Sequence, residues 1–112
     1  MVSVTYDMTE SVKEIIKKLP DGLKKKIEAY IEILKIKGHE ISLPYADKIE
    51  GYKNMHELRP HFHNIEFRLL YYWNGNHVRF VNAFEERGKK KENRREYEKA
   101  DQIRNILTGK EH

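Results

Sequence analysis

The sequence predicts an α+β domain of order β-α-α-β-β-β-α, with an N-terminal strand and a helix hairpin packed on a small antiparallel sheet. Three patterns support this order: helical spacing of apolar residues in the first third, β-branched and aromatic residues over 65–84, and a second helical stripe at the C-terminus. The length of 112 residues suits one domain with one core. We expect the domain to span residues 1–108 and the tail, 109–112, to fray.

The chain begins with a short β-prone segment, residues 2–6, which we expect to be the first strand. The following helix has two candidate starts, because Ser11 and Glu14 have capping-box spacing and Thr9 is a rival N-cap. Its apolar stripe consists of Val12, Ile15, Ile16 and Leu19.

A second helix follows a break at Pro20 and Gly22, and Asp21 is expected to cap it. Its apolar stripe consists of Leu23, Ile27, Tyr30, Ile31 and Leu34. Gly38 is the expected C-terminal stop. Because the connection is short, the two helices should form an antiparallel hairpin.

After an irregular region, residues 39–54, the sequence predicts a β-meander. Its strongest signal is Asn74-Gly75, which favours a type I′ turn in a two-residue hairpin. The register that follows places Tyr71 opposite Val78, Leu69 opposite Phe80, Phe67 opposite Asn82, and Ile65 opposite Phe84. This face is nearly all apolar, so we expect it to pack on the helix hairpin.

The opposite face of the sheet carries charge. Arg68 lies there, and a strand over residues 55–59 that buries Leu58 turns Glu57 and Arg59 toward the same side. The register also predicts that His56 faces the core. An acid beside several arginines suits the binding of a phosphodiester and raises the question of its cleavage.

A C-terminal helix is expected from about Glu92, with a narrow apolar stripe of Tyr97, Ala100, Ile103 and Leu107. The segment from Arg87 to Arg95 contains six basic residues and one acid, whereas the net charge of the whole chain is only +4. Such a block indicates a polyanionic partner, with a solvated loop and helix start as the alternative.

Several classes of site are excluded or disfavoured. The chain has no cysteine, which rules out disulfides and thiolate metal sites. His61 and His63 have no third ligand at a recognisable spacing, so we expect no metal. No apolar stretch approaches the roughly 20 residues of a membrane span, and no signal peptide is evident. We therefore expect a soluble, cytoplasmic protein that does not enter a membrane.

These motifs, in this order, resemble the RelE/ParE toxin superfamily and within it the phage-derived HigB-like branch. The resemblance covers about residues 45–107 and rests on Lys48 and Gly51, Glu57-Leu58-Arg59, Phe67-Arg68-Leu69-Leu70-Tyr71, Phe84, and Glu96-Tyr97-Glu98-Lys99-Ala100. There are two departures. Glu85-Glu86-Arg87 stands where relatives often carry two basic residues after the Phe, and Lys91-Glu92 replaces a usual Thr-Pro.

The resemblance implies the toxin of a type II toxin–antitoxin pair, a ribosome-dependent mRNA endonuclease. Attack of a ribose 2′-hydroxyl on the adjacent phosphate would leave a 2′,3′-cyclic phosphate without a metal or other cofactor. The implied partners are a HigA-like helix-turn-helix antitoxin and mRNA on the ribosome. Two alternatives stay open: a ParE-like inhibitor of DNA gyrase, and an inactive phage-derived remnant that binds nucleic acid or a partner.

Five residues match catalytic positions of the superfamily. Arg68 matches the central arginine and Arg87 a second phosphate-binding arginine, whereas ion pairing or loop solvation would explain them without function. Arg59 is the strand arginine, which either orients RNA or pairs with Glu57. Glu57 is a general base or a structural acid. Tyr97 either contacts the substrate or belongs to the apolar stripe.

A wider set of residues is expected to contact RNA rather than to take part in the chemistry. Backbone contacts of this kind carry affinity without sequence specificity. The set consists of Lys48, His61, His63, Lys89, Lys90, Lys91, Arg94 and Arg95.

Overall fold

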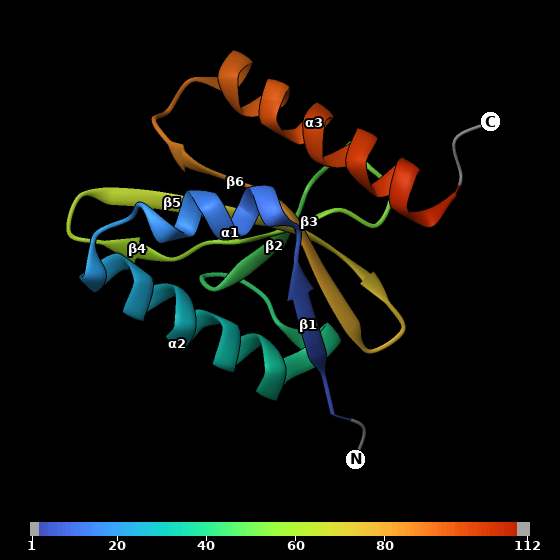
Figure 1. Cartoon of the computed structure of the whole chain (residues 1–112), viewed down its shortest axis with the longest axis horizontal. Helices are drawn as coiled ribbons and strands as arrows, with labels where there is room; N and C mark the ends of the chain where they lie inside the picture. Colours follow the sequence, from blue (N-terminus) through green and yellow to red (C-terminus); the bar gives the residue numbers. More distant parts are fainter. Residues whose placement is uncertain (1–2, 110–112) are drawn as a thin grey trace.

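The computed structural model describes residues 3–109 and has a mixed sheet between two helical layers. Figure 1 shows α3 on one side of the strands and α2 on the other. The elements are β1 (Thr5–Met8), α1 (Glu10–Lys17), α2 (Asp21–Lys37), the 3₁₀ turn η1 (Gly38–Glu40), β2 (Ala46–Lys48), β3 (His56–Leu58), β4 (His61–Phe62), β5 (Ile65–Asn74), β6 (His77–Glu86) and α3 (Lys90–Thr108). The predicted α+β class is confirmed, with β2 and β4 as additional short strands.

The sheet has the order β1-β6-β5-β3-β2, with β4 paired to β5. The first strand begins at Thr5, later than expected, and Val2 of the predicted strand lies outside the described residues. β1 pairs parallel with β6, Thr5 opposite His77, so the sheet is not purely antiparallel. The chain between these two strands contains α1, α2 and strands β2 to β5, far more than the dozen residues that a parallel pairing requires.

The helix ends resolve the alternatives in the sequence. Thr9 is the N-cap of α1, because its Oγ accepts the Val12 amide at 3.3 Å, and a capping box at Ser11 is therefore not the start. The expectation that Asp21 caps α2 is wrong: Pro20 is the N-cap and Asp21 is already in the first turn. Gly38 ends α2 as expected, with φ of 59°.

The predicted hairpin register is wrong by two residues at the turn. Asn74 pairs with His77, so the central turn residues are Gly75 and Asn76, and Tyr71 lies opposite Phe80. Gly75 has a positive φ of 61°, whereas Asn76 does not have a positive φ. This is the φ pattern of a type II′ turn, which requires glycine at the first central position.

A β-bulge then inverts part of β6. Tyr71 pairs with Phe80 but Leu70 pairs with Asn82, which leaves Val81 as the extra residue. Beyond the bulge, Ala83 packs toward the helix hairpin, while Asn82 and Phe84 face α3. The prediction that Asn82 and Phe84 face the hairpin is therefore wrong.

Two apolar clusters hold the layers together. The larger joins α1 and α2 to one face of the sheet through Val12, Leu23, Ile27, Ile31, Leu34, Leu58, Leu69, Tyr71, Val78 and Phe80. The smaller joins α3 to the other face through Met55, Leu70, Tyr72, Val81 and Ala100. The face that carries the predicted arginines is thus partly covered by a helix.

The C-terminal helix begins at Lys90, slightly earlier than expected, and Gly109 is its C-cap with φ of 70°. The rest of the predicted frayed tail, residues 110–112, lies outside the described residues. Within residues 3–109, no helix combines the length and apolar character needed to cross a membrane.

Candidate functional site

The centre of the candidate site is Glu57 in β3. Leu58 points into the core toward α1 and α2, so strand alternation turns Glu57 toward α3, where only 6% of it is exposed. Its Oε2 accepts from Arg59 Nη1 at 2.9 Å, and its Oε1 accepts from the Tyr97 hydroxyl at 3.2 Å. Arg68 Nε lies 3.9 Å from Oε1. The structure thus brings Glu57, Arg59, Arg68 and Tyr97 together.

Arg68 in β5 is the most enclosed arginine of this group, with 4% of its surface exposed. Its Nη1 donates to the carbonyl of Phe67 at 3.0 Å and lies 3.5 Å from Glu66 Oε1. Its Nη2 lies 4.0 Å from Glu86 Oε2. Arg68 therefore faces three carboxylates at once, those of Glu57, Glu66 and Glu86.

We call Glu57, Arg59, Glu66, Arg68, Glu86 and Tyr97 the acid–arginine cluster. Including Asp47, which lies 3.9 Å from Arg59, four carboxylates lie within 4.0 Å of the two guanidinium groups. The guanidinium charge is therefore more than neutralised in this structure. A phosphate that binds Arg68 must compete with carboxylates already there.

Glu66 and Glu86 are the members of the cluster that the sequence did not single out as site residues. Glu86 accepts hydrogen bonds from the backbone N–H of Gly88 and from Asn93 Nδ2, the latter at 3.2 Å. The Gly88 hydrogen bond, followed by those of Asn93 and the charges of Arg68 and Arg59, lowers the pKa of Glu86 despite its partial burial. The only sequence signal was that acids replace the usual basic residues after Phe84.

Tyr97 belongs to the apolar stripe of α3, and its hydroxyl also reaches the acid–arginine cluster. Its ring packs edge-on against Phe84 and Tyr52 with centroids 6.2 and 6.1 Å apart, as expected for a residue of the apolar stripe. Burial, followed by the nearby charge and hydrogen bond of Glu57, raises the pKa of Tyr97 to about 12. The phenol is therefore protonated at neutral pH and acts as a donor to Glu57.

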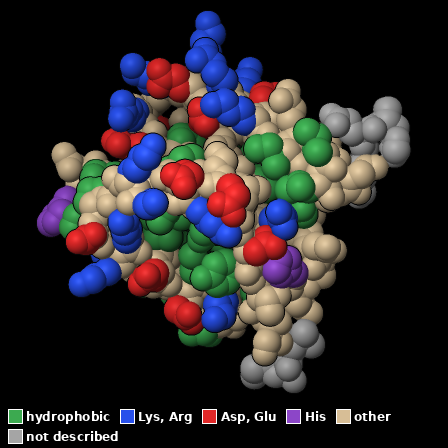
Figure 2. Space-filling model, in the orientation of Figure 1, with side chains coloured by type: hydrophobic (Ala, Val, Ile, Leu, Met, Phe, Trp, Pro, Cys, Tyr) green, Lys and Arg blue, Asp and Glu red, His purple; other side chains and the backbone are tan. Residues whose placement is uncertain are grey.

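Arg87 is not brought into the cluster. Its side chain is exposed, and its Nη2 lies 3.5 Å from Glu85. The basic segment that follows, Lys89, Lys90, Lys91, Arg94 and Arg95, is also exposed. Figure 2 shows Lys and Arg side chains gathered over the start of α3, with acidic side chains among them.

The remaining predicted RNA contacts are dispersed. Lys48 pairs with His56 in the β2–β3 ladder, and β-alternation puts it on the opposite face of the sheet from Glu57. His61 is exposed and lies 3.9 Å from Glu66, at the edge of the cluster. His63 is exposed, and its ring packs against Phe62. Within residues 3–109, no three His, Cys, Asp or Glu side chains form a group that could hold a metal ion.

The predicted orientation of His56 is confirmed. Its ring stacks on Tyr71 with centroids 5.4 Å apart, on the face packed against α1 and α2. Burial, followed by the charge of Lys48, lowers the pKa of His56.

The chemistry that the acid–arginine cluster can support rests on a carboxylate, a phenol donor and two guanidinium groups.

The chain matches the family described as Phage derived protein Gp49-like (DUF891) over residues 14–105. Two solved structures have a similar fold. One is the free state of an E. coli toxin RelE mutant with two arginines changed to alanine. It has a TM-score of 0.66 and 15% sequence identity, and the match covers 88% of this chain and 95% of that one. The other is the RelB–RelE antitoxin–toxin complex from Methanococcus jannaschii. It has a TM-score of 0.54 and 21% sequence identity, and the match covers 84% of this chain and 98% of that one. No curated protein matches the chain.

Proposed function

The chain belongs to the phage-derived Gp49-like family and has a RelE-like fold, and from this premise we propose that it is the toxin of a type II toxin–antitoxin pair. The proposed activity is metal-independent cleavage of mRNA on the ribosome, as in the HigB-like branch. The proposed partner is a HigA-like helix-turn-helix antitoxin. The similar M. jannaschii chain was solved with an antitoxin, which supports a partner of this kind. We place the toxin in the cytoplasm, as one domain over residues 1–108.

The observation that carries the proposal is the contact of Glu57 with Tyr97 at 3.2 Å beside Arg68. In the proposed reaction, Glu57 accepts the proton of the ribose 2′-hydroxyl, and the 2′-oxygen attacks phosphorus. The bond to the 5′-oxygen breaks, leaving a 2′,3′-cyclic phosphate. Tyr97 donates a proton to the departing 5′-oxygen and regains one from Glu57, which restores both groups.

The two arginines have a separate role in the proposal. Arg59 and Arg68 balance the charge that develops on the phosphate oxygens, because guanidinium groups bind such oxygens in a bidentate way. Arg59 is partly exposed and Arg68 is buried, so Arg59 makes the first contact. The Arg68 pairs with Glu66 and Glu86 are long, at 3.5 and 4.0 Å, and the substrate phosphate displaces those carboxylates.

One observation favours a second candidate, a protein that binds a partner without cleaving RNA. The carboxylates outnumber the guanidinium groups in the cluster, and Glu86 stands where relatives of the branch usually keep a positive charge. Such a protein would be a ParE-like gyrase inhibitor or an inactive remnant. Both need the fold but no acid–base pair.

The test is controlled expression followed by mapping of mRNA 5′ ends during translation. The proposal predicts codon-phased cuts that disappear in Glu57→Gln and Arg68→Ala. Arg79→Ala is the matched control, because Arg79 is an arginine of the same sheet that pairs with Asp7 at 2.9 Å, outside the cluster. Thermal unfolding of each purified variant shows whether a lost activity reflects a lost fold.

The alternatives give different results in the same experiment. Growth arrest with intact mRNA and altered DNA supercoiling would support a gyrase inhibitor instead. Expression with no effect on growth or mRNA would support the inactive remnant. Neutralisation of toxicity by a small helix-turn-helix protein encoded beside this chain would support the antitoxin partner.

A further inference from the structure

A polar cavity lies on the opposite face of the sheet from Glu57. It has a volume of about 570 Å³, within the range of roughly 300–1,000 Å³ that is typical of small-molecule sites. The connection from η1 to β2 forms one wall, and β2, β3 and β5 form the floor. Its lining includes His39, Ser42, Lys48, His56, Tyr71 and Trp73.

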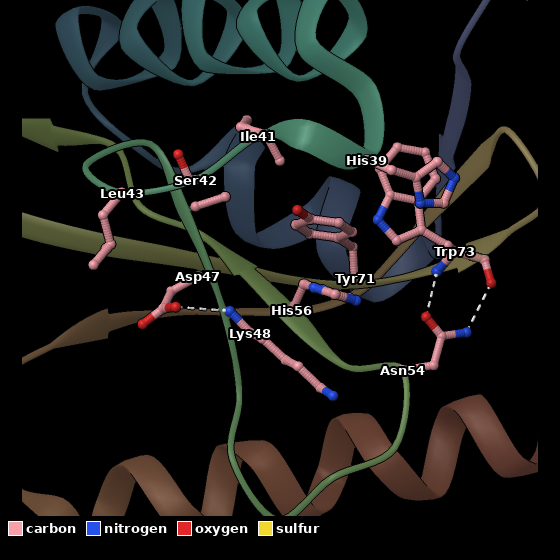
Figure 3. Close-up of a pocket in the computed structure, with 11 residues that line it drawn as sticks. His39, Ile41, Ser42, Leu43, Asp47, Lys48, Asn54, His56, Tyr71 and Trp73 are labelled. Atoms are coloured by element: carbon pink, nitrogen blue, oxygen red, sulfur yellow. Dashed lines mark hydrogen bonds between the residues drawn. The ribbon is translucent and has the colours of Figure 1, made fainter.

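Two aromatic pairs give the cavity fixed planar surfaces. His39 stacks on Trp73 with ring centroids 3.8 Å apart and an interplanar angle of 26°. His39 Nε2 lies 2.9 Å from the carbonyl oxygen of Gly75, an acceptor, so this nitrogen carries the proton and holds the ring in place. His56 stacks on Tyr71 at an angle of 20°. In Figure 3, Tyr71 lies between His39 and Trp73 at one end and Leu43 and Asp47 at the other.

The wall near Trp73 is also fixed. Asn54 Nδ2 donates to the Trp73 carbonyl at 2.8 Å, and Asn54 Oδ1 accepts the Trp73 amide at 3.2 Å, as the dashed lines of Figure 3 show. This pair of hydrogen bonds ties the loop before β3 to β5. A preformed cavity of this kind loses little conformational entropy when it binds a ligand.

The Tyr71 hydroxyl is the least satisfied polar group of the cavity. Tyr71 is fully buried, and its hydroxyl oxygen has no hydrogen-bond partner among residues 3–109. In Figure 3 this hydroxyl points toward the loop that carries Ser42 and Leu43. Burial raises the pKa of Tyr71, so the phenol stays protonated. A buried hydroxyl without a partner is costly, and a ligand that pairs with it recovers that cost.

The cavity has one cation in its lining. Lys48 is exposed, and its ammonium group forms no ion pair within the described part of the chain. The neighbouring Asp47 does not neutralise it: Oδ1 accepts the Lys48 backbone N–H at 2.9 Å, and Oδ2 lies 3.9 Å from Arg59. Because the pKa of His56 is lowered, its imidazole is neutral and offers both a donor and an acceptor.

We propose that this cavity binds a nucleoside monophosphate unit, with the base among the stacked aromatic rings and the phosphate on Lys48. The base supplies a flat ring for the aromatic surfaces and polar edges for Tyr71, Ser42 and His56. The phosphate supplies the negative charge that pairs with the Lys48 ammonium group. A free nucleotide and one nucleotide of an RNA strand share this chemistry. The site is on the face away from Glu57 and does not depend on RNA cleavage.

The test uses Trp73, the only tryptophan of the chain, as a reporter inside the site. Its fluorescence is followed during titration with AMP, GMP, CMP and UMP, with the matching nucleosides, and with a short single-stranded RNA. We expect a saturable change with at least one nucleotide. Tyr71→Phe removes only the hydroxyl and should weaken binding by about five- to tenfold, the equivalent of one hydrogen bond.

Lys48→Ala separates phosphate recognition from base recognition. It should weaken binding of the monophosphate and leave that of the nucleoside unchanged. Lys53→Ala, at an exposed lysine that does not line the cavity, and Tyr52→Phe, at a tyrosine on the α3 side, are matched controls that should bind as the parent does. Circular dichroism confirms that each variant is folded.

Two outcomes would overturn the proposal. The first is the absence of a saturable Trp73 signal with every nucleotide and with the RNA. The second is a signal that neither Tyr71→Phe nor Lys48→Ala weakens. A response to the RNA alone, weakened by both variants, supports the site and identifies a strand as the source of the nucleotide.

Discussion

The hydroxyl of Tyr97 offers a sharp test of how the acid–arginine cluster is held together. Tyr97→Phe removes the hydrogen bond to Glu57 at 3.2 Å and keeps the ring contacts with Phe84 and Tyr52. Hydrogen bonds to charged groups contribute about 1.5–3 kcal/mol. This one is long for an O–H donor, and Glu57 keeps Arg59 at 2.9 Å, so we expect a loss below that range, about 1 kcal/mol.

The expected change is measurable by thermal unfolding. A chain of 112 residues has an unfolding entropy of about 235 cal/mol/K, so a loss of 1 kcal/mol lowers Tm by about 4 °C. Tyr52→Phe is the matched control, because Tyr52 donates to Glu98 at 2.7 Å but that carboxylate is exposed. We expect the control to lose less than about 0.5 kcal/mol. Equal losses in the two variants would refute the argument that the burial of Glu57 strengthens its hydrogen bond.

The pH dependence of the same variant gives an independent check. The pKa of Tyr97 is raised from its ordinary value of 10.0 to about 12 in the folded protein. Its stabilising contribution is therefore complete below pH 10 and is lost as pH rises through about 12. The other tyrosines are present in both proteins, so the stability difference between parent and Tyr97→Phe should shrink above pH 10. A difference that stays constant up to pH 11.5 would contradict this assignment.

Three further predictions follow from the fold and the proposed function. The pKa of Glu86 is lowered from its ordinary value of 4.5, so the contribution of its carboxylate to folding stability is complete above pH 4.5 and is lost as the pH falls below it. In denaturant unfolding, Glu86→Gln should therefore lose less stability than the parent between pH 6 and pH 3. Gly22→Ala would place a Cβ 2.2 Å from Phe62 Cζ, so it should lower the free energy of unfolding by about 1–3 kcal/mol despite the higher helix propensity of alanine. Adding Phe62→Leu to this variant should restore most of the lost stability. Replacing Lys89, Lys90 and Lys91 together by alanine should reduce the slope of the log binding constant for single-stranded RNA against log salt concentration by about 2. Fluorescence anisotropy measures this slope, and an unchanged slope would exclude phosphate contacts at these lysines.

The fold was predictable because most of its signals are local. Helical spacing and the glycine at Gly38 determined α2, and strand alternation around Leu58 determined which way Glu57 faces. The register of β5 and β6 was not predictable from the sequence. Asn74-Gly75 and Gly75-Asn76 are both acceptable turns, and only packing selects between them. The bulge at Val81 has no local signature either.

The candidate site was predictable to a similar extent. Glu57, Arg59 and Arg68 meet because period-two alternation places them on one face. The enclosure of Arg68 by Glu86 was not predictable, because it depends on the bulge and on the turn at Gly88 that carries the hydrogen bond to Glu86. Arg87, which precedes Gly88 in that turn, is exposed to solvent and pairs with Glu85. No spacing rule predicts this orientation.

The parallel pairing of β1 with β6 has a consequence for how the chain folds during synthesis. Thr5 lies opposite His77, a sequence separation of 72 residues, and β1 occupies the sheet edge beside β6. Contacts of such high contact order form slowly, because the intervening chain must be closed into a loop first. While the chain is still being translated, β1 has no partner until β6 has left the ribosome. The sheet is therefore completed only near the end of translation, and a nascent chain that stops before β6 lacks Glu86 and cannot complete the acid–arginine cluster.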